Sequence, residues 1–294
     1  MCVRARLCSV LCATLIVAAG SGLAAHDFWL EPSTFAPGVD EPVRIHLRIG
    51  ERFAGESLAR NGSLIEKFVI VGPSGERPVL GRDGMDPAGL VRLDAPGIWF
   101  VGYRSRPSAV ELAPEKFEQY LREEGLEHII QERVARKETL LPVRERFSRS
   151  VKSILRYGGD QAVQGYDRAL GMTLEFVLDA DPARASGGRV PVRLLRDGRP
   201  LPGALVVAYR KDSSAAFPGP ASQGKAAESR EANESLEANK SKEALRARTD
   251  KDGRIVLPVS SGVWLLKSVY MERAAAGSGA DWESVWSALT FMVS

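Results

Sequence analysis

Apolar and polar residues alternate along the stretch from Glu41 to Tyr103, and turn residues separate the alternating segments. Val43 to Ile49 alternates at every position, and Phe68 to Val71 runs into the turn formed by residues 72–75. A period of two buries one face of a β-strand. The stretch from Leu90 to Tyr103 has a turn at its centre and reads as a hairpin that ends in a well-buried strand. This pattern predicts a β-sandwich.

The pattern changes to spacings of three and four after Pro114, a residue suited to the first turn of a helix. Three helical segments are predicted, and glycines end the first and the third. The apolar positions are Phe117, Tyr120 and Leu121 in the first segment; Leu126, Ile129, Ile130 and Val134 in the second; and Val143, Phe147, Val151, Ile154 and Leu155 in the third. We therefore expect a helical insertion at about 114–157, whose many Arg and Glu residues form a solvated face.

Strand patterns resume at Thr173 and continue to the end of the sequence, interrupted by a linker of small residues at 183–188. Within 213–247 the only large apolar residues are Phe217, Leu236 and Leu245, which is too little apolar surface to offset the entropy of ordering. The predicted fold is therefore mainly β, with two β-sandwich-like domains of immunoglobulin or transthyretin type. The first spans 25–182 and carries the helical insertion, and the second spans 189–294 and carries a disordered insertion at about 213–247.

The first 24 residues have the three parts of a signal peptide: Arg4 and Arg6, an apolar stretch of thirteen residues from Leu7 to Ala19, and small residues after it. A membrane-spanning helix needs about 20 apolar residues, and no later stretch approaches that length. We therefore expect a secreted protein, periplasmic or extracellular, with no membrane span after signal removal.

All three cysteines, Cys2, Cys8 and Cys12, lie in the predicted signal, so the mature chain has neither a disulfide nor a thiolate metal site. Removing the signal leaves 38 basic and 37 acidic residues. A charge this close to balance gives no basic patch for nucleic acid, and no nucleic-acid partner is expected.

The sequence contains none of the common catalytic or nucleotide-binding motifs. Its three histidines provide few candidates for a general base that would activate a catalytic nucleophile. We therefore expect a protein that is not an enzyme, although a hydrolase that uses two carboxylates stays open. Five tryptophans either fill the sandwich cores or form a stacking platform for sugars. They are Trp29, Trp99, Trp264, Trp282 and Trp286.

The segment Ala25-His26-Asp27 follows the predicted signal directly. Cleavage after Ala24 would make His26 the second residue, so that a free amino group, a backbone nitrogen and an imidazole converge. This set suits nickel(II) or copper(II). Cleavage after Ala25 would make His26 itself the N-terminal residue, and the other interpretation is a histidine that only caps the first strand.

Six segments carry a resemblance over nearly the whole mature chain. They are AHDFWLEP, the segment from Ile49 to Gly55, FEQYLREEGLEHIIQERVARKE, RPLPGALVVAYR, TDKDGRIVLPV and DWESVWSALTF. The chain resembles a family of exported bacterial proteins of unknown function that look related to the periplasmic component of nickel and cobalt uptake systems. The resemblance implies an N-terminal β domain with helices, a C-terminal immunoglobulin-like or transthyretin-like domain, and a metal ion held by the terminal amine, a histidine near it and a further histidine.

His26 is the only residue whose surrounding motif matches this metal-binding pattern. Ala25 would supply the amine, and His46 is the candidate for the further histidine ligand. His128 falls in the helical insertion, and Tyr270 stands where the pattern has a histidine. The expected function is that of an extracytoplasmic accessory protein that binds nickel, cobalt or copper and works with a membrane metal transporter. The alternative is a non-catalytic scaffold, adhesion or carbohydrate-contacting module.

Overall fold

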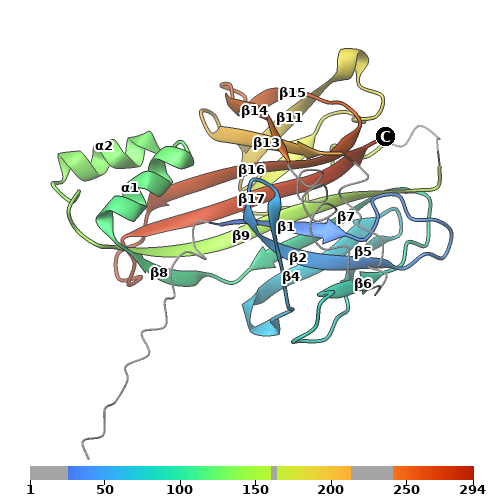
Figure 1. Ribbon diagram of the computed structural model, residues 1–294, viewed down its shortest axis with the longest axis horizontal. Coiled ribbons are helices and arrows are strands. Elements are labelled where there is room, and N and C mark those ends of the chain that lie inside the picture. Colours follow the sequence, from blue (N-terminus) through green and yellow to red (C-terminus); the bar gives the residue numbers. More distant parts are fainter. Residues whose placement is uncertain (1–25, 160–163, 213–240) are drawn as a thin grey trace, which may run out of the picture.

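Three β-sheets packed face to face account for most of the chain in the computed structural model, which describes residues 26–159, 164–212 and 241–294 (Figure 1). A large central sheet lies between two smaller outer sheets, and each interface holds its own apolar core. The prediction of a mainly β, sandwich-like protein is confirmed.

The central sheet contains, among the described residues, nine strands in the order β14-β13-β16-β17-β9-β7-β4-β5, with β8 paired to β9. The pairing of β17 with β9 is parallel, and the other pairings in this sheet are antiparallel. The strands are β4 (Ile65–Gly72), β5 (Gly75–Pro78), β7 (Gly97–Ser105), β8 (Ser108–Leu112), β9 (Val143–Tyr157), β13 (Leu205–Lys211), β14 (Lys242–Arg248), β16 (Gly262–Arg273) and β17 (Trp282–Val293).

The two outer sheets each have four strands in the described part of the chain. The first outer sheet consists of β1 (Asp27–Pro32), β2 (Val43–Glu51), β3 (Ala54–Leu58) and β6 (Gly89–Val91). The second consists of β10 (Leu174–Leu178), β11 (Arg189–Arg196), β12 (Arg199–Pro200) and β15 (Arg254–Pro258). Short 3-10 turns, η2 (Gly62–Leu64) and η3 (Ser186–Gly188), precede β4 and β11.

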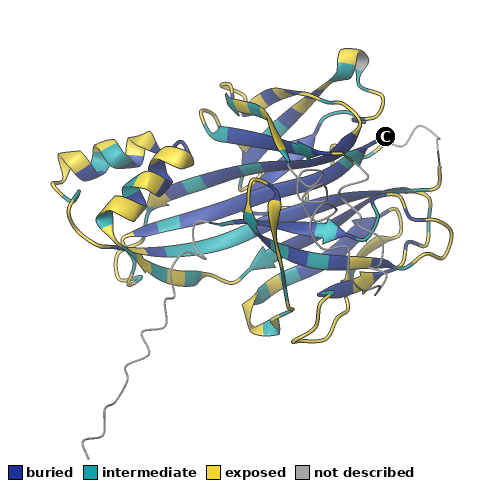
Figure 2. Cartoon of the chain, in the orientation of Figure 1, coloured by how far each residue is buried: buried dark blue, intermediate teal, exposed yellow. Residues whose placement is uncertain are grey.

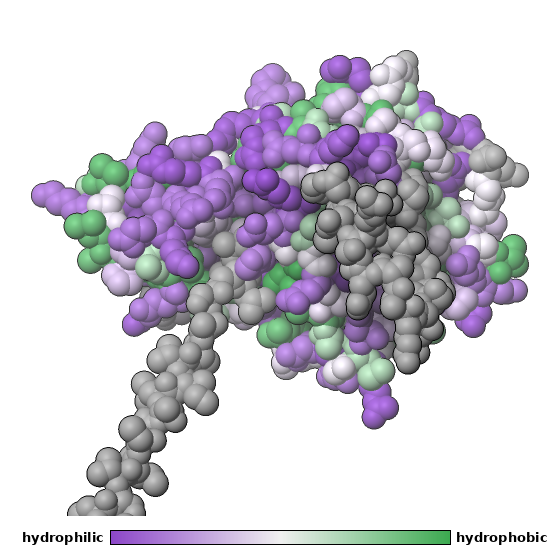
Figure 3. All heavy atoms as spheres, in the orientation of Figure 1, coloured by the Kyte–Doolittle hydropathy of each residue, from purple (hydrophilic) through white to green (hydrophobic). Residues whose placement is uncertain are grey.

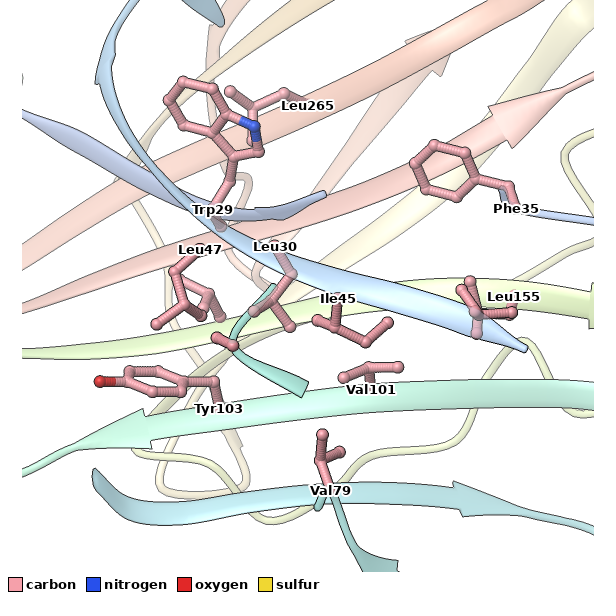
Figure 4. Close-up of a cluster of buried hydrophobic side chains, with 14 of the residues drawn as sticks. Trp29, Leu30, Phe35, Ile45, Leu47, Val79, Val101, Tyr103, Leu155 and Leu265 are labelled. Atoms are coloured by element: carbon pink, nitrogen blue, oxygen red, sulfur yellow. The ribbon is translucent and has the colours of Figure 1, made fainter. Parts of the chain in front are cut away.

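Successive side chains of a strand point to opposite faces of a sheet, so each central strand contributes apolar residues to both cores. In β7, Trp99 and Val101 pack against the first outer sheet, whereas Ile98 and Phe100 pack against the second. Figure 4 shows Leu30 and Ile45 of the first outer sheet above Val101 of the central sheet. The long central strands are accordingly the most buried part of the fold (Figure 2). All five tryptophans are at most 4% exposed, which confirms that they fill the cores.

Two helices, α1 (Pro114–Glu123) and α2 (Glu127–Ala135), lie beside one end of β9, β16 and β17 (Figure 1). Phe117 and Leu121 of α1 enter a third core, where the Tyr120 ring stacks on Trp286 with centroids 5.4 Å apart. Val269 and Met271 of β16 share this core. Since Val263 and Leu265 of the same strand reach the first outer sheet, the helices and that sheet cover the same face.

The predicted helical insertion ends earlier than expected, because residues 143–157 form strand β9 rather than a third helix. Val143, Phe147, Val151 and Leu155 are spaced by four, which fits a helix but is also a multiple of the strand period of two. Glu145 lies between them and is itself buried, so the alternation was hidden. The prediction of a helix at this position was wrong.

The proposed boundary at 183–188 separates two stretches whose strands meet in one sheet: β9 precedes it, β17 follows it, and the two strands pair. Within the predicted disordered insertion, residues 242–247 belong to strand β14 and therefore are ordered. Residues 213–240, and the predicted signal peptide at 1–24, lie outside the described residues.

The exposed face seen in Figure 3 is mainly hydrophilic, with hydrophobic atoms gathered in small separate groups. In the part of the chain that the structure describes, no helix combines the length and apolar character needed to cross a membrane.

Replacing Gly72 by alanine is expected to lower the free energy of unfolding by about 1–3 kcal/mol, as overpacking of a core does. A Cβ atom at Gly72 would lie 2.2 Å from the ring of Trp99. Trp99 is fully buried, and its indole N–H donates to the carbonyl of Ala95 at 2.9 Å, so the ring has little room to move. Urea unfolding of both proteins measures the difference.

The matched control is Gly38→Ala, because a Cβ there would meet only the carboxylate of Glu41, at 3.5 Å. This variant should stay within about 0.5 kcal/mol of the parent protein. Equal stabilities for the Gly72 and Gly38 variants would contradict the close packing of Gly72 against Trp99.

Candidate functional site

A polar cavity of about 160 Å³ opens beside the start of β1. Elements from distant parts of the sequence meet here: β1, the turn after β2, the end of α1, and strands β13, β14 and β16. We call it the N-terminal pocket, and it is lined by Asp27, Glu51, Arg52, Glu123, Glu124, Tyr209, Arg246 and Lys267.

The hairpin between β2 and β3 forms one wall of the N-terminal pocket. Asp27 pairs with Gly50 across β1 and β2, which places Glu51 next to the first residue of β1. Arg52 and Phe53 both have positive φ, 51° and 64°, as the two central residues of a type I′ turn require. Phe53 is a bulky residue for this conformation, and its burial against the Trp29 ring, 5.5 Å away, holds it there.

Lys267 lies at the base of the pocket and joins two carboxylates from separate elements. Its ammonium group donates to Asp27 at 2.6 Å and to Glu124 at 2.7 Å. Burial by itself would lower the pKa of Lys267, but the charges of Glu124 and Asp27 outweigh burial and raise it, so the lysine stays protonated. Burial raises the pKa of Glu124 despite the nearby lysine. Asp27 also accepts the backbone N–H of Arg52, at 3.2 Å.

His26 adjoins the lining of this pocket, because it directly precedes Asp27 in the chain. Its Nε2 atom is 3.7 Å from a carboxylate oxygen of Glu51, and its side chain is 36% exposed. Ala25, the expected source of the terminal amine, lies outside the described residues. The structure therefore brings a carboxylate, Glu51, to the imidazole of His26.

His46 is at the opposite end of the same strand pair, across from Glu31. Glu51 is five positions further along β2, which is about 17 Å at ~3.4 Å per residue. Its Nδ1 atom is hydrogen-bonded to Asp86 at 2.6 Å. The structure does not bring His46 to His26, and Glu51 is the side chain that the fold places there instead.

The other two positions that the family pattern raised do not line the N-terminal pocket. His128 is exposed on α2. Tyr270 alternates with Val269 and Met271 on β16, so it points to the opposite face of the central sheet, where its hydroxyl donates to Glu272 at 3.0 Å. Among residues 26–159, 164–212 and 241–294, no group of three or more His, Cys, Asp or Glu side chains is placed to hold a metal ion.

Sequence reasoning missed Glu51, Asp27, Glu124 and Lys267 as members of one site. Lys267 had a detectable signal, because it is the only charged residue in the apolar run from Val263 to Val269. A lone charge in a buried strand needs a partner. Its partners come from residues 27 and 124, and no local pattern relates those positions to Lys267.

Comparison with known proteins gives a match to one family model. The family model described as a domain of unknown function (DUF4198) matches residues 23–272. No curated protein matches the chain. The crystal structure of dimeric latent PorU from Porphyromonas gingivalis is similar over 91% of this chain at 11% identity, with a TM-score of 0.18. The match covers 20% of that structure's chain.

Proposed function

The chain belongs to the family described as a domain of unknown function (DUF4198), and for this member we propose a non-catalytic, extracytoplasmic role in binding a transition-metal ion. The ion is nickel(II), cobalt(II) or copper(II), and the bound ion is passed to a membrane metal transporter. The observation that carries the proposal is the position of His26, which directly precedes Asp27 and lies beside Glu51, two residues that line a polar pocket.

The ligand chemistry around His26 supports this choice of ion. Imidazole nitrogen suits nickel, copper and zinc, and the cysteine-free mature chain offers no thiolate that would favour structural zinc. His26 comes immediately before β1, whose first residue is held by Lys267 and the hairpin turn. The position of the imidazole is therefore set by a rigid strand rather than by a free tail.

The proposed ligand set is the His26 imidazole, the amine and backbone nitrogen created by signal cleavage after Ala24, and the carboxylate of Glu51. In this set Glu51 takes the place first given to His46. Asp27 is not included, because both of its oxygens are occupied by Lys267 and the Arg52 backbone. The buried tryptophans leave the carbohydrate-stacking alternative without the exposed rings it required.

Protein that starts at Ala25 is expected to bind one nickel(II) or copper(II) ion, measured by titration calorimetry. His26→Ala should weaken binding at least about tenfold, because a chelating nitrogen is lost. One extra N-terminal residue should weaken it as well, because it moves the amine away from His26. Affinity should fall as the pH is lowered, because the nitrogen ligands must be deprotonated to bind.

His128→Ala and His46→Ala are the matched controls, since both remove a histidine that does not line the N-terminal pocket. Both should bind like the parent protein. Glu51→Gln distinguishes the ligand set that contains Glu51 from the one that contains His46. Weaker metal binding by this variant, together with unchanged binding by His46→Ala, supports Glu51 as the ligand. Equal binding by His26→Ala and the parent protein would refute the proposal.

A further inference from the structure

A second, larger cavity lies on the opposite face of the central sheet, at the end that the second outer sheet leaves uncovered. Its volume is about 340 Å³. Tyr270 and Glu272 of β16, Glu283 of β17, Ser148 of β9 and Arg104 of β7 contribute to its walls. Arg196, at the end of β11, closes the side toward the second outer sheet. We call it the far-face cavity.

Two arginines of the far-face cavity keep unused hydrogen-bond donors. Arg104 donates from Nη2 to Glu66 at 2.9 Å, and Arg196 donates from Nη2 to Glu272 at 3.2 Å. The Nε atom of each guanidinium is buried and has no hydrogen-bond partner among the described residues. These covered Nε atoms cannot reach a ligand, but a guanidinium has five N–H donors. Within the described residues, Arg104 uses one of them and Arg196 uses two, on Asp197 and Glu272, and both side chains are partly exposed, so each can donate to ligand oxygens.

The charges around the cavity are already paired, which decides what kind of ligand fits. Glu66 and Glu272 each accept from an arginine, and Glu283 lies 3.9 Å from Arg146. A strongly charged ligand would have to displace one of these partners. A hydroxyl group can accept from an arginine N–H and donate to a carboxylate at once, so it leaves the ion pairs intact.

We propose that the far-face cavity binds a small uncharged polyhydroxyl molecule, a saccharide or a sugar alcohol. Arg104 and Arg196 donate to its oxygens, the neighbouring carboxylates accept from its hydroxyls, and Tyr270 adds a phenolic oxygen beside Glu272. The volume is near the lower end of the range of about 300–1,000 Å³ that small-molecule pockets have, so the cavity suits one or two sugar rings.

A neighbouring cavity of about 250 Å³ gives the ligand room to extend, because Arg104 lines both cavities. Leu170 and Met172 form an apolar part of the wall of this neighbouring cavity. The C–H face of a sugar ring can pack against such a surface. A disaccharide that passes over Arg104 should therefore bind more tightly than either of its component sugars.

The test is binding of glucose, galactose, mannitol, sucrose and trehalose to the protein, measured by saturation-transfer NMR and quantified by calorimetry. Succinate and spermidine serve as charged comparisons. At least one polyhydroxyl compound should bind with a Kd of about 1–10 mM or below, and more tightly than both charged compounds. Tyr270→Phe, which removes a single oxygen, and Arg104→Gln should each weaken that binding by about tenfold.

Arg136→Gln is the control, because Arg136 pairs with Glu132 on α2, which packs on the other face of the central sheet and does not line the cavity. Melting temperatures of all variants show whether they are folded. The proposal is overturned if no polyhydroxyl compound binds up to about 10 mM, if a charged compound binds more tightly, or if folded cavity variants bind like the control. The His26→Ala variant should bind the sugar normally, so the outcome is independent of the metal proposal.

Discussion

Glu145→Gln is expected to make the protein more stable at pH 8, by an amount of the order of 2–3 kcal/mol. Glu145 is fully buried on β9, where it accepts hydrogen bonds from the hydroxyls of Tyr120 and Ser284. Its other oxygen has no hydrogen-bond partner in the described part of the chain. Burial raises the pKa of Glu145 from 4.5 to about 7, although both hydroxyls act in the opposite direction.

The raised pKa fixes the direction of the pH dependence. Below pH 4.5 the carboxyl is protonated in both the folded and the unfolded state, so its contribution to stability is fully present. As pH rises from 4.5 to about 7, the unfolded state loses its proton first, and the free energy of unfolding falls. Above about 7 the folded protein holds an ionised carboxylate that pairs with no cation among the described residues. Glutamine has no such charge at any pH.

Urea unfolding at pH 5 and pH 8 measures this effect for the parent protein and for Glu145→Gln. The parent should lose stability between the two pH values by more than the variant does. Glu111→Gln on the adjacent strand β8 is the matched control, because Glu111 is exposed and should leave the pH dependence unchanged. An identical change with pH in the parent and in Glu145→Gln would refute the assignment.

Lys267→Met is expected to destabilise the protein by about 3–5 kcal/mol, the usual cost of removing one partner from a buried ion pair. Methionine has a similar length, but it leaves the buried carboxylates of Asp27 and Glu124 without their cation. Burial already raises the pKa of Glu124, and loss of the lysine should raise it further. The deficit relative to the parent should therefore shrink as the pH is lowered and Glu124 is protonated.

Adding Asp27→Asn and Glu124→Gln to Lys267→Met should restore much of the lost stability, because the triple variant buries no unpaired charge. Lys251→Met is the control: Lys251 pairs with Asp252 on the surface, and its loss should leave the stability close to that of the parent protein. Chemical unfolding of the four proteins gives these differences. A triple variant no more stable than the single one would show that Lys267 matters through packing rather than charge.

The sequence predicted the strands whose buried and exposed residues alternate strictly. In β2, Val43, Ile45, Leu47 and Ile49 are buried in turn, as the alternation required. In β9 the alternation was concealed, because buried Glu145 and Lys152 stand where an apolar residue is expected. Lys152 is stabilised there by Glu175, 2.8 Å away on β10, and such a distant partner leaves no local pattern.

The candidate site was predictable only where it depends on residues that are neighbours in the sequence. His26 was found because it is adjacent to a predicted cleavage site, and the strand register then explains why Glu51 lies beside it. His46 was selected from the few histidines available, and nothing local fixed its distance from His26. The far-face cavity combines residues from β7, β9, β11, β16 and β17, so only the folded structure reveals it.

The position of β17 sets the order in which this protein can fold. It is the last strand in the sequence, yet it lies in the interior of the central sheet, paired along its length with β16 and β9. Until β17 is in place, β9 and β16 each present an unpaired edge that another chain could join. Pairing β9 with β17 also requires closing a loop of more than a hundred residues, a slow step in folding. The N-terminal half therefore cannot finish its sheet alone, and a chain cut short before Trp282 would be expected to aggregate.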